Sequence, residues 1–151
     1  MKKLICLIMV ICIAAACIGC TSKFTKSITY SVETGEKVKV SMEATDGYDL
    51  TGENEPPFII TYNGEQLSHG TFIGGEFYES YEQIVKEDPN AKQLAAGELN
   101  GGKYLFWSYG ENEFNYIILL KGGKTAVILG NNTSEESAKA VFERLTIKTT
   151  R

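Results

Sequence analysis

The segment "NYIILLKGGKTAVILGNNTSEESAKAVFERLTI", residues 115–147, contains the order of elements that sets the fold class. Its first half holds two strongly apolar runs, 115–120 and 125–130, separated by a Lys-Gly-Gly-Lys turn. Apolar runs of this length with a glycine turn between them predict paired antiparallel strands. Together with the preceding apolar run, 103–109, they predict a three-stranded meander.

The second half of this segment predicts an amphipathic helix over 133–145 and then a short strand over 146–150. Thr133 is the expected N-cap of the helix, with Glu136 as its reciprocal partner in a capping box. The buried stripe of the helix is expected to consist of Ala138, Val141, Phe142 and Leu145.

Upstream of this segment, the chain predicts two more hairpins. Polar and apolar residues alternate over 28–42 on both sides of Gly35, which predicts a hairpin with one solvated face. A second hairpin, over 57–73, contains an Asn-Gly dipeptide at 63–64, the pair best suited to a two-residue turn. The residues between the hairpins, 44–57, are rich in glycine, proline and acidic side chains and predict a loop.

A second amphipathic helix is predicted over 76–88 and ends before Pro89. Residues 92–99 then predict a weaker strand that leads into the meander. The apolar stripe of this helix is expected to consist of Phe77, Tyr78, Tyr81, Ile84 and Val85.

These elements predict an α+β fold, mostly antiparallel β-sheet with two amphipathic helices packed on it in a sandwich. One domain, residues 28–151, contains all of them. The order of hairpins, helix, meander, helix and short strand loosely resembles the Mog1/PsbP-like sandwich. Residues 115–147 are the matching stretch, and the resemblance lies in their order of elements and in no residue motif. The resemblance implies an architecture and assigns no functional residue.

The first 20 residues have the organisation of an export signal. Lys2 and Lys3 precede an uncharged apolar run, 4–20, which is short for a membrane-spanning helix of about 20 residues. The run ends in small residues followed by cysteine and resembles the signal peptide of bacterial lipoproteins. This resemblance implies cleavage before a cysteine that carries acyl chains and becomes the mature N-terminus. It implies a protein anchored to the cell membrane through lipid, on the extracytoplasmic side.

Cys20 and Cys17 are both candidates for lipidation, because small residues precede each of them. Cleavage at Cys20 removes every other cysteine, whereas cleavage at Cys17 leaves a free thiol in an oxidising compartment. We therefore expect a signal peptide, 1–20, that ends at a lipidated Cys20 and is followed by a tether, 21–27. Lipidation at Cys17, an ordinary signal peptide and an uncleaved anchor are the alternatives.

The chain that follows Cys20 is acidic. It keeps 13 of the 15 basic residues and all 19 acidic residues, a formal charge of −6. A chain of this sign lacks the cationic surface that nucleic-acid binding needs, so we expect no nucleic-acid partner. The net charge also predicts no attraction to anionic lipid. The mature chain offers no cysteine pair, so its stability must come from packing.

Acidic side chains in the predicted loop are candidates for cation ligands. They are Asp46, Asp49, Glu53 and Glu55, together with Asn54. Carboxylate oxygens suit calcium, but the spacing lacks the alternation of an EF-hand loop. A solvated acidic loop is therefore the main interpretation, and no metal or cofactor is expected. The C-x-x-C at 17–20 does not predict zinc, because no second pair of ligands accompanies it.

The aromatic strand over 103–109 and the single histidine are the remaining candidates for a site. His69 has no nucleophile or acid motif near it in the sequence, which favours a structural or surface role over general-base catalysis. Aromatic residues occupy both faces of the strand and predict a central strand within the core. A ligand pocket lined by Trp107 and Tyr109, which share one face, is the functional alternative.

Together, these features predict a non-enzymatic module at the cell envelope that binds a protein or a small ligand. The prediction rests on the lipoprotein-type leader, the short tether and the lack of a nucleophile, base or metal motif in the sequence. An envelope protein with a structural or stress-protective role is one alternative. An enzyme whose site assembles from residues distant in sequence is the other.

Overall fold

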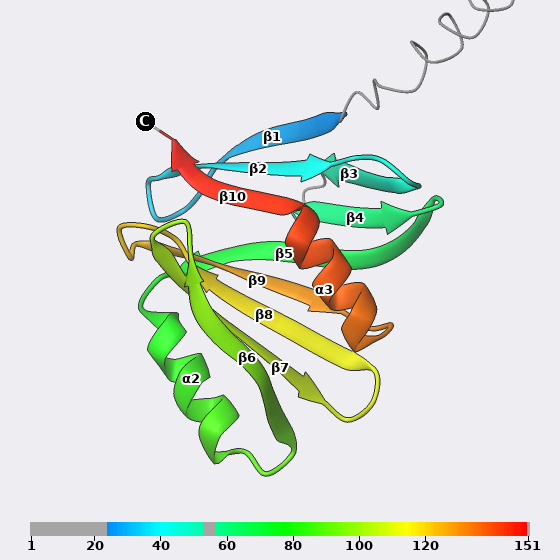
Figure 1. Ribbon diagram of the computed structural model, residues 1–151. Helices are drawn as coiled ribbons and strands as arrows, with labels where there is room; N and C mark the ends of the chain where they lie inside the picture. Colours follow the sequence, from blue (N-terminus) through cyan, green and yellow to red (C-terminus); the bar gives the residue numbers. More distant parts are fainter. Residues whose placement is uncertain (1–23, 53–56, 151) are drawn as a thin grey trace, which may run out of the picture.

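The computed structural model describes residues 24–52 and 57–150, which form two antiparallel sheets and two helices (Figure 1). The small sheet has the order β1-β2-β10, with strands Thr25–Ser31, Lys37–Glu43 and Leu145–Thr150. The large sheet has the order β3-β4-β5-β9-β8-β7-β6. Its strands are β3, Tyr48–Gly52; β4, Phe58–Tyr62; β5, Glu65–Gly74; β6, Ala91–Leu99; β7, Gly102–Tyr109; β8, Glu113–Leu119; and β9, Thr125–Asn131. The helices are α2, Phe77–Glu87, and α3, Glu135–Arg144.

The large sheet is the central layer of a sandwich. The small sheet and α3 cover one of its faces, and α2 covers part of the other (Figure 1). The predicted α+β sandwich, mostly antiparallel sheet with two packed helices, is confirmed. In the described part of the chain, neither helix is long and apolar enough to cross a membrane.

The main core lies between the small sheet and the large sheet. Val38, Val40 and Met42 of β2 are at most 1% exposed, and they belong to the same cluster as Val127 and Leu129 of β9. Successive side chains of a strand point to opposite faces, so this period-two pattern aims one face of each sheet inward. The alternation over 28–42 therefore predicts the buried face of the first hairpin correctly.

The turn between β4 and β5 uses the predicted residues. Asn63 and Gly64 have φ values of 51° and 85°, as a type I′ turn requires. Asn100 and Gly101, with φ values of 54° and 80°, make the corresponding turn between β6 and β7. Both hairpins are therefore set by local turn chemistry.

The predicted loop over 44–57 was wrong in part, because it contains β3. In this strand Leu50 is 1% exposed and pairs in register with Ile60 of β4. The short run between Gly47 and Gly52 is held by pairing with β4, which no local pattern reveals. The first strand also begins earlier than Ile28, at Thr25.

The capping box predicted for α3 is a second correction. The N-cap is Ser134, whose hydroxyl accepts a hydrogen bond from the Ser137 N–H at 3.1 Å. The backbone N–H of Thr133 instead donates to Asn131 Oδ1 at 2.9 Å. The Asn131 side chain therefore fixes the turn before the helix and moves the cap by one residue.

The buried face of α2 is narrower than predicted. Tyr78 and Val85 are buried under the helix, whereas Phe77 and Ile84 are 50% and 48% exposed. The helix rests on the sheet along one line of residues, and its neighbouring apolar positions face solvent.

One edge of the sandwich is closed by polar contacts between the two sheets. Lys26 Nζ of β1 lies 2.7 Å from Asp49 Oδ1 of β3. The Tyr30 hydroxyl donates to the Pro57 carbonyl oxygen at 2.9 Å. These contacts hold β1 against the β3 edge of the large sheet.

Candidate functional site

Three aromatic rings form a continuous stack from the large sheet to α3. The ring centroids of Phe106 and Tyr116 are 4.1 Å apart, and those of Tyr116 and Phe142 are 4.2 Å apart. The interplanar angles are 8° and 5°. Tyr104 adds a tilted contact to Phe142 at 5.0 Å. Burial raises the pKa of the Tyr116 phenol above its ordinary value, so the stack is uncharged at neutral pH.

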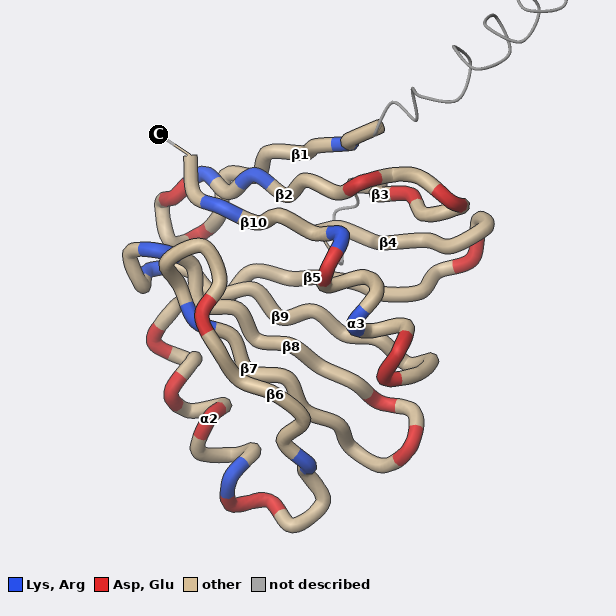
Figure 2. The backbone as a smooth tube through the Cα atoms, in the orientation of Figure 1, with Lys and Arg blue, Asp and Glu red and all other residues tan. Residues whose placement is uncertain are grey.

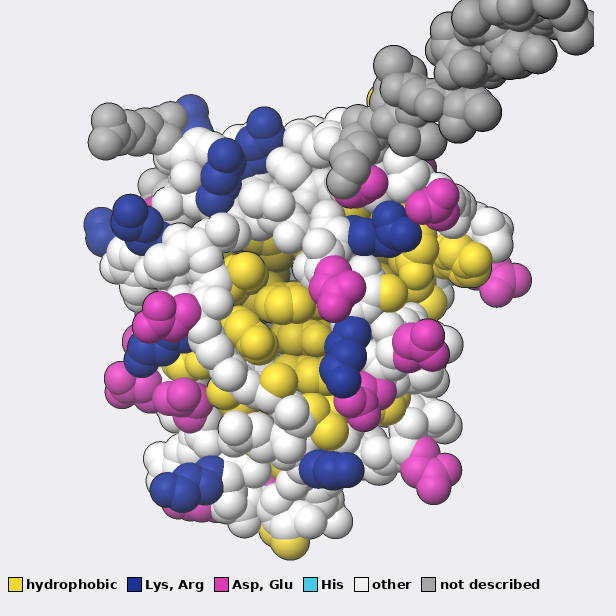
Figure 3. Space-filling model, viewed as in Figure 1, with side chains coloured by type: hydrophobic (Ala, Val, Ile, Leu, Met, Phe, Trp, Pro, Cys, Tyr) yellow, Lys and Arg dark blue, Asp and Glu magenta, His cyan; other side chains and the backbone are white. Residues whose placement is uncertain are grey.

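An apolar groove opens beside this stack, between β10 and α3 on one side and β6 to β8 on the other. Figure 3 shows hydrophobic side chains gathered in a hollow at this place. At its β10 end the groove contains a cavity of about 340 Å³. Small-molecule pockets typically measure about 300–1,000 Å³, so the cavity is large enough for part of a ligand. Its apolar lining consists of Leu99, Ile118, Leu120 and Ile147.

Two lysines line the mouth of this cavity. Lys121 follows β8 and Lys148 belongs to β10, and both side chains are exposed. Among the described residues, no carboxylate lines the cavity. An apolar interior with cations at one end suits a ligand that has an apolar body and an anionic end.

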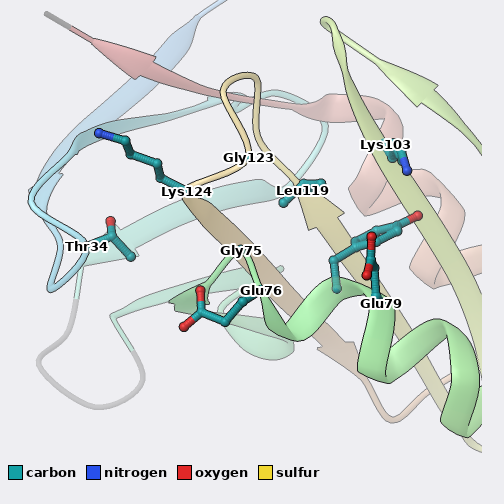
Figure 4. Close-up of a pocket in the computed structure, with 9 residues that line it drawn as sticks. Thr34, Gly75, Glu76, Glu79, Lys103, Leu119, Gly123 and Lys124 are labelled. Atoms are coloured by element: carbon teal, nitrogen blue, oxygen red, sulfur yellow. The ribbon is translucent and has the colours of Figure 1, made fainter.

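A larger hollow, about 730 Å³, lies between the start of α2, β7 and the turn from β8 to β9 (Figure 4). Its charged lining comprises Glu76, Glu79, Lys103 and Lys124. Figure 4 shows Lys124 extending away from both carboxylates, and Lys103 Nζ lies 5.7 Å from the ring centroid of Tyr78. Charges of both signs that do not converge on one point define no ligand position. The apolar groove is therefore the stronger candidate.

Trp107 and Tyr109 lie on the α2 face of the large sheet, away from the groove. Trp107 is 3% exposed and contacts Tyr81, with ring centroids 5.7 Å apart. Its indole N–H has no hydrogen-bond partner in the described structure. Burial, followed by the charge of Asp88, raises the pKa of the half-buried Tyr109. Both residues therefore belong to the second core, under α2.

The candidate cation ligands that the structure describes are paired with separate cations. Asp46 Oδ2 lies 3.4 Å from Arg144 Nη2, and Asp49 pairs with Lys26, whose hydrogen bond lowers the pKa of that carboxyl. Within residues 24–52 and 57–150, no three His, Cys, Asp or Glu side chains are grouped closely enough to hold a metal ion. Other predicted residues lie outside the described ranges: Glu53, Asn54, Glu55, Cys17 and Cys20.

His69 rests on the backbone of the neighbouring strand. A Cβ atom at Gly130 would lie only 2.8 Å from His69 Cε1, so the missing side chain at 130 makes room for the imidazole. Asn115 Oδ1 lies on the other side of the same position. This packing gives His69 a structural role on the face of the large sheet.

The sequence alone does not bring the groove residues together. It places Phe142 on a helix, Leu99 in a weak strand and Ile147 in the final strand. Their meeting depends on β10, which pairs with β2 more than 100 residues earlier in the chain. The density of aromatic residues over 103–109 is the one local signal, and it points to the right strand but equally to both of its faces.

No protein-family model matches the sequence, and no curated protein matches it significantly, so the groove geometry and the leader sequence are the basis for assigning a function.

Proposed function

We propose that this protein is a lipid-anchored, extracytoplasmic binding module, and that the apolar groove is its binding site. The observation that carries the proposal is an open apolar groove beside the buried aromatic stack. It contains a cavity of about 340 Å³ that is lined by four aliphatic side chains and by Lys121. The ligand is a linear apolar chain with an anionic head, such as a single acyl chain bearing a carboxylate or a phosphate.

The energetics of the groove support a chain-like ligand. Each methylene group that leaves water gains about 0.8 kcal/mol, so even a short chain along the groove supplies useful affinity. Lys121 adds attraction for an anionic head at one end. Tyr104 and Phe142, which are half-buried beside the stack, provide apolar ring surface along which a chain can lie without hydrogen bonds.

The leader supports a location next to the membrane, whose lipids contain acyl chains of this kind. The five residue steps from Cys20 to Thr25 span at most about 18 Å when fully extended. An acylated Cys20 therefore keeps the domain close to the membrane surface. Two or three acyl chains hold a protein on a membrane essentially permanently.

The groove favours binding over catalysis. Its lining is apolar apart from a few exposed amines, hydroxyls and one amide, and His69 lies elsewhere, on β5. General acid–base work needs a titratable pair within hydrogen-bond reach of a bound ligand. We therefore infer that the ligand leaves the groove chemically unchanged.

Photo-crosslinking tests the groove in the intact anchored protein. A hexadecanoic acid that carries a diazirine should label peptides containing Leu99, Tyr104 and Phe142. Leu99→Glu places a charge in the groove and should lower the labelling at least about tenfold, since one buried charge outweighs the gain of several methylenes. Ile84→Glu, at an exposed apolar position on α2, is the matched control and should keep full labelling.

The role of the anionic head is tested by comparing the diazirine-bearing hexadecanoic acid with the corresponding alcohol, which has no charge. Lys121→Glu should weaken labelling by the acid and leave labelling by the alcohol unchanged. Labelling spread evenly over the protein surface with both probes would support the alternative of an envelope protein without a ligand.

The anchor is tested by fractionation and mass spectrometry. Cys20→Ala should release the protein or leave an unprocessed precursor, whereas Cys17→Ala should keep it on the membrane. A diacylglyceryl mass on Cys20 is expected. The same mass on Cys17 moves the site by three residues, and an unmodified N-terminus beyond residue 20 would rule out the lipoprotein assignment.

A further inference from the structure

The outer face of the small sheet carries only polar side chains in the described chain. Its outward positions alternate with the core positions of β1, β2 and β10, and neither helix covers them. The hydroxyl side chains on this face are Thr25, Ser27, Thr29, Ser31, Ser41, Thr146 and Thr150. Its charged side chains are Lys37, Lys39, Lys148 and Glu43. A protein that is acidic overall therefore presents a cationic, hydroxyl-rich sheet face.

Two of these lysines lie side by side. Lys39 of β2 pairs directly with Lys148 of β10 in the antiparallel register. Opposite residues on one face have Cβ atoms about 4.5–5.5 Å apart, and like charges at this spacing destabilise a sheet. A lysine on an edge strand can protect that edge from aggregation, but Lys39 lies on the central strand, where no edge needs protection. An anionic partner would remove the repulsion.

A group of acidic residues lies along α2, at the other end of the molecule. Figure 2 shows Lys on β2 and β10 and a concentration of Asp and Glu along α2. Around this helix lie Glu76, Glu79, Glu82, Glu87 and Asp88, with Lys86 as the only cation within it. Acidic residues also lie beside the small sheet, at Glu33, Glu36, Asp46 and Asp49. The outer face of that sheet nevertheless carries three lysines and one glutamate, so an anionic surface would attract this face and repel α2.

The tether joins the chain at the cationic end. The described chain begins at Phe24, next to β1, which is a strand of the small sheet. With at most about 18 Å between Cys20 and Thr25, an anchor at Cys20 holds this sheet near the lipid headgroups. A tether of this length allows the lysines of the sheet to approach within about 8–10 Å of the surface, the distance over which its potential decays.

We propose that the outer face of the small sheet docks on the anionic headgroups of the membrane that carries the anchor, with Lys37, Lys39 and Lys148 against phosphate groups and the hydroxyl side chains donating hydrogen bonds to them. This docking rests on the proposed lipid anchor and adds an orientation to it. The acidic α2 end then points away from the membrane. The net charge alone predicts no attraction to anionic lipid. This proposal replaces that expectation with a local attraction at the outer face of the small sheet.

Lysine labelling on vesicles tests the docking with the acylated full chain. The protein is reconstituted into vesicles of phosphatidylcholine alone or with phosphatidylglycerol, and the rate of amine acetylation is measured at each lysine by mass spectrometry. On anionic vesicles, acetylation of Lys39 and Lys148 should slow about fivefold or more, and high salt should restore it. Lys92, exposed on β6, should react equally in both vesicles.

A paired variant separates docking from simple proximity. Lys37→Glu with Lys39→Glu should abolish the protection of Lys148 on anionic vesicles, whereas Lys92→Glu should leave it intact. Equal acetylation of Lys148 in both vesicle types for the wild type would overturn the docking. So would protection by soluble polyglycerol phosphate without protection on phosphatidylglycerol vesicles, because the partner would then be a polymer.

Vesicle flotation keeps the two proposals distinguishable. Wild-type protein that floats with both vesicle types while its lysines react equally refutes the docking and leaves the anchor intact. Wild-type protein that floats with neither type refutes the anchor, and the docking falls with it.

Discussion

At Ser134 one hydroxyl determines where α3 begins. It accepts a hydrogen bond from the Ser137 N–H, one of the donors that a helix start leaves unpaired. Ser134→Ala should therefore lower the free energy of unfolding by about 1 kcal/mol. Thr133→Ala removes only an exposed side chain and should cost much less. Urea unfolding of both variants decides between them, and a larger loss for Thr133→Ala would contradict the cap.

Tyr78 makes the fold sensitive to alkali. Burial, followed by the charge of Glu82, raises the pKa of its phenol to about 12. The unfolded chain loses this proton near pH 10, so it binds fewer protons than the folded chain between pH 10 and 12, and stability falls as pH rises. The shift of about 2 units corresponds to about 2–3 kcal/mol, all of it present below pH 10.

Tyr78→Phe tests this dependence. The variant should lose less stability between pH 10 and 12 than the wild type, as measured by urea unfolding at each pH. Part of the loss remains, because burial also raises the pKa of Tyr116. Tyr62→Phe, at an exposed position, is the control and should keep the wild-type slope. An unchanged slope in Tyr78→Phe would contradict the assignment.

At the scale of elements, β4 and β5 depend on a close approach between Phe58 and Gly70. These residues pair in register, and a Cβ atom at position 70 would lie 1.9 Å from the Phe58 ring. Phe58 is 0% exposed, and its ring packs against those of Tyr30 and Phe72. Gly70→Ala should therefore destabilise the fold by about 2–3 kcal/mol through overpacking.

A double variant checks the cause. Phe58→Leu should recover part of the stability lost in Gly70→Ala, because the two positions share one space. Gly52→Ala is the control, since its Cβ would lie 3.2 Å from Ile28 Cδ1 and from the Tyr30 hydroxyl oxygen and should cost less than Gly70→Ala. Additive effects of Gly70→Ala and Phe58→Leu would contradict the steric explanation.

Elements with strong local signals are predictable from this sequence, and elements held by distant partners are less so. The turn at Asn63-Gly64 and the helix before Pro89 follow from local chemistry and lie where expected. β3 could not be predicted in this way. Its five residues include Asp49 and end at a glycine, and they are extended because they pair with β4. Propensity is a weak guide to strands whose partners decide their stability.

At the scale of the whole molecule, the groove was not predictable, because it too depends on contacts between segments that are distant in the sequence. Each of its walls follows from the sequence: Tyr104 in an aromatic strand, Phe142 on a helix face and Ile147 in a final strand. Their common site requires that the chain divides its strands between two sheets, and no local pattern specifies this division. The predicted pair Trp107 and Tyr109 shows how far alternation can predict a site. It places both residues on one face of β7 correctly, but it does not say which layer covers that face.

The whole domain should fold without crosslinks. All four cysteines lie at or before residue 20, so residues 24–150 contain none. The melting temperature should therefore be the same with and without a reducing agent. Differential scanning calorimetry of the processed protein measures this directly. A large drop on adding reductant would mean that a disulfide stabilises the domain and would contradict this expectation.

The pairing of β2 with β10 has a consequence for how the protein is made. β2 is synthesised about 100 residues before β10. One edge of β2 therefore stays without its partner strand until residues 145–150 have been made. A growing chain cannot complete the small sheet until residues 145–150 have been synthesised. Until then the second edge of β2 stays unpaired, and β10 joins the first hairpin only after every strand of the large sheet has been made.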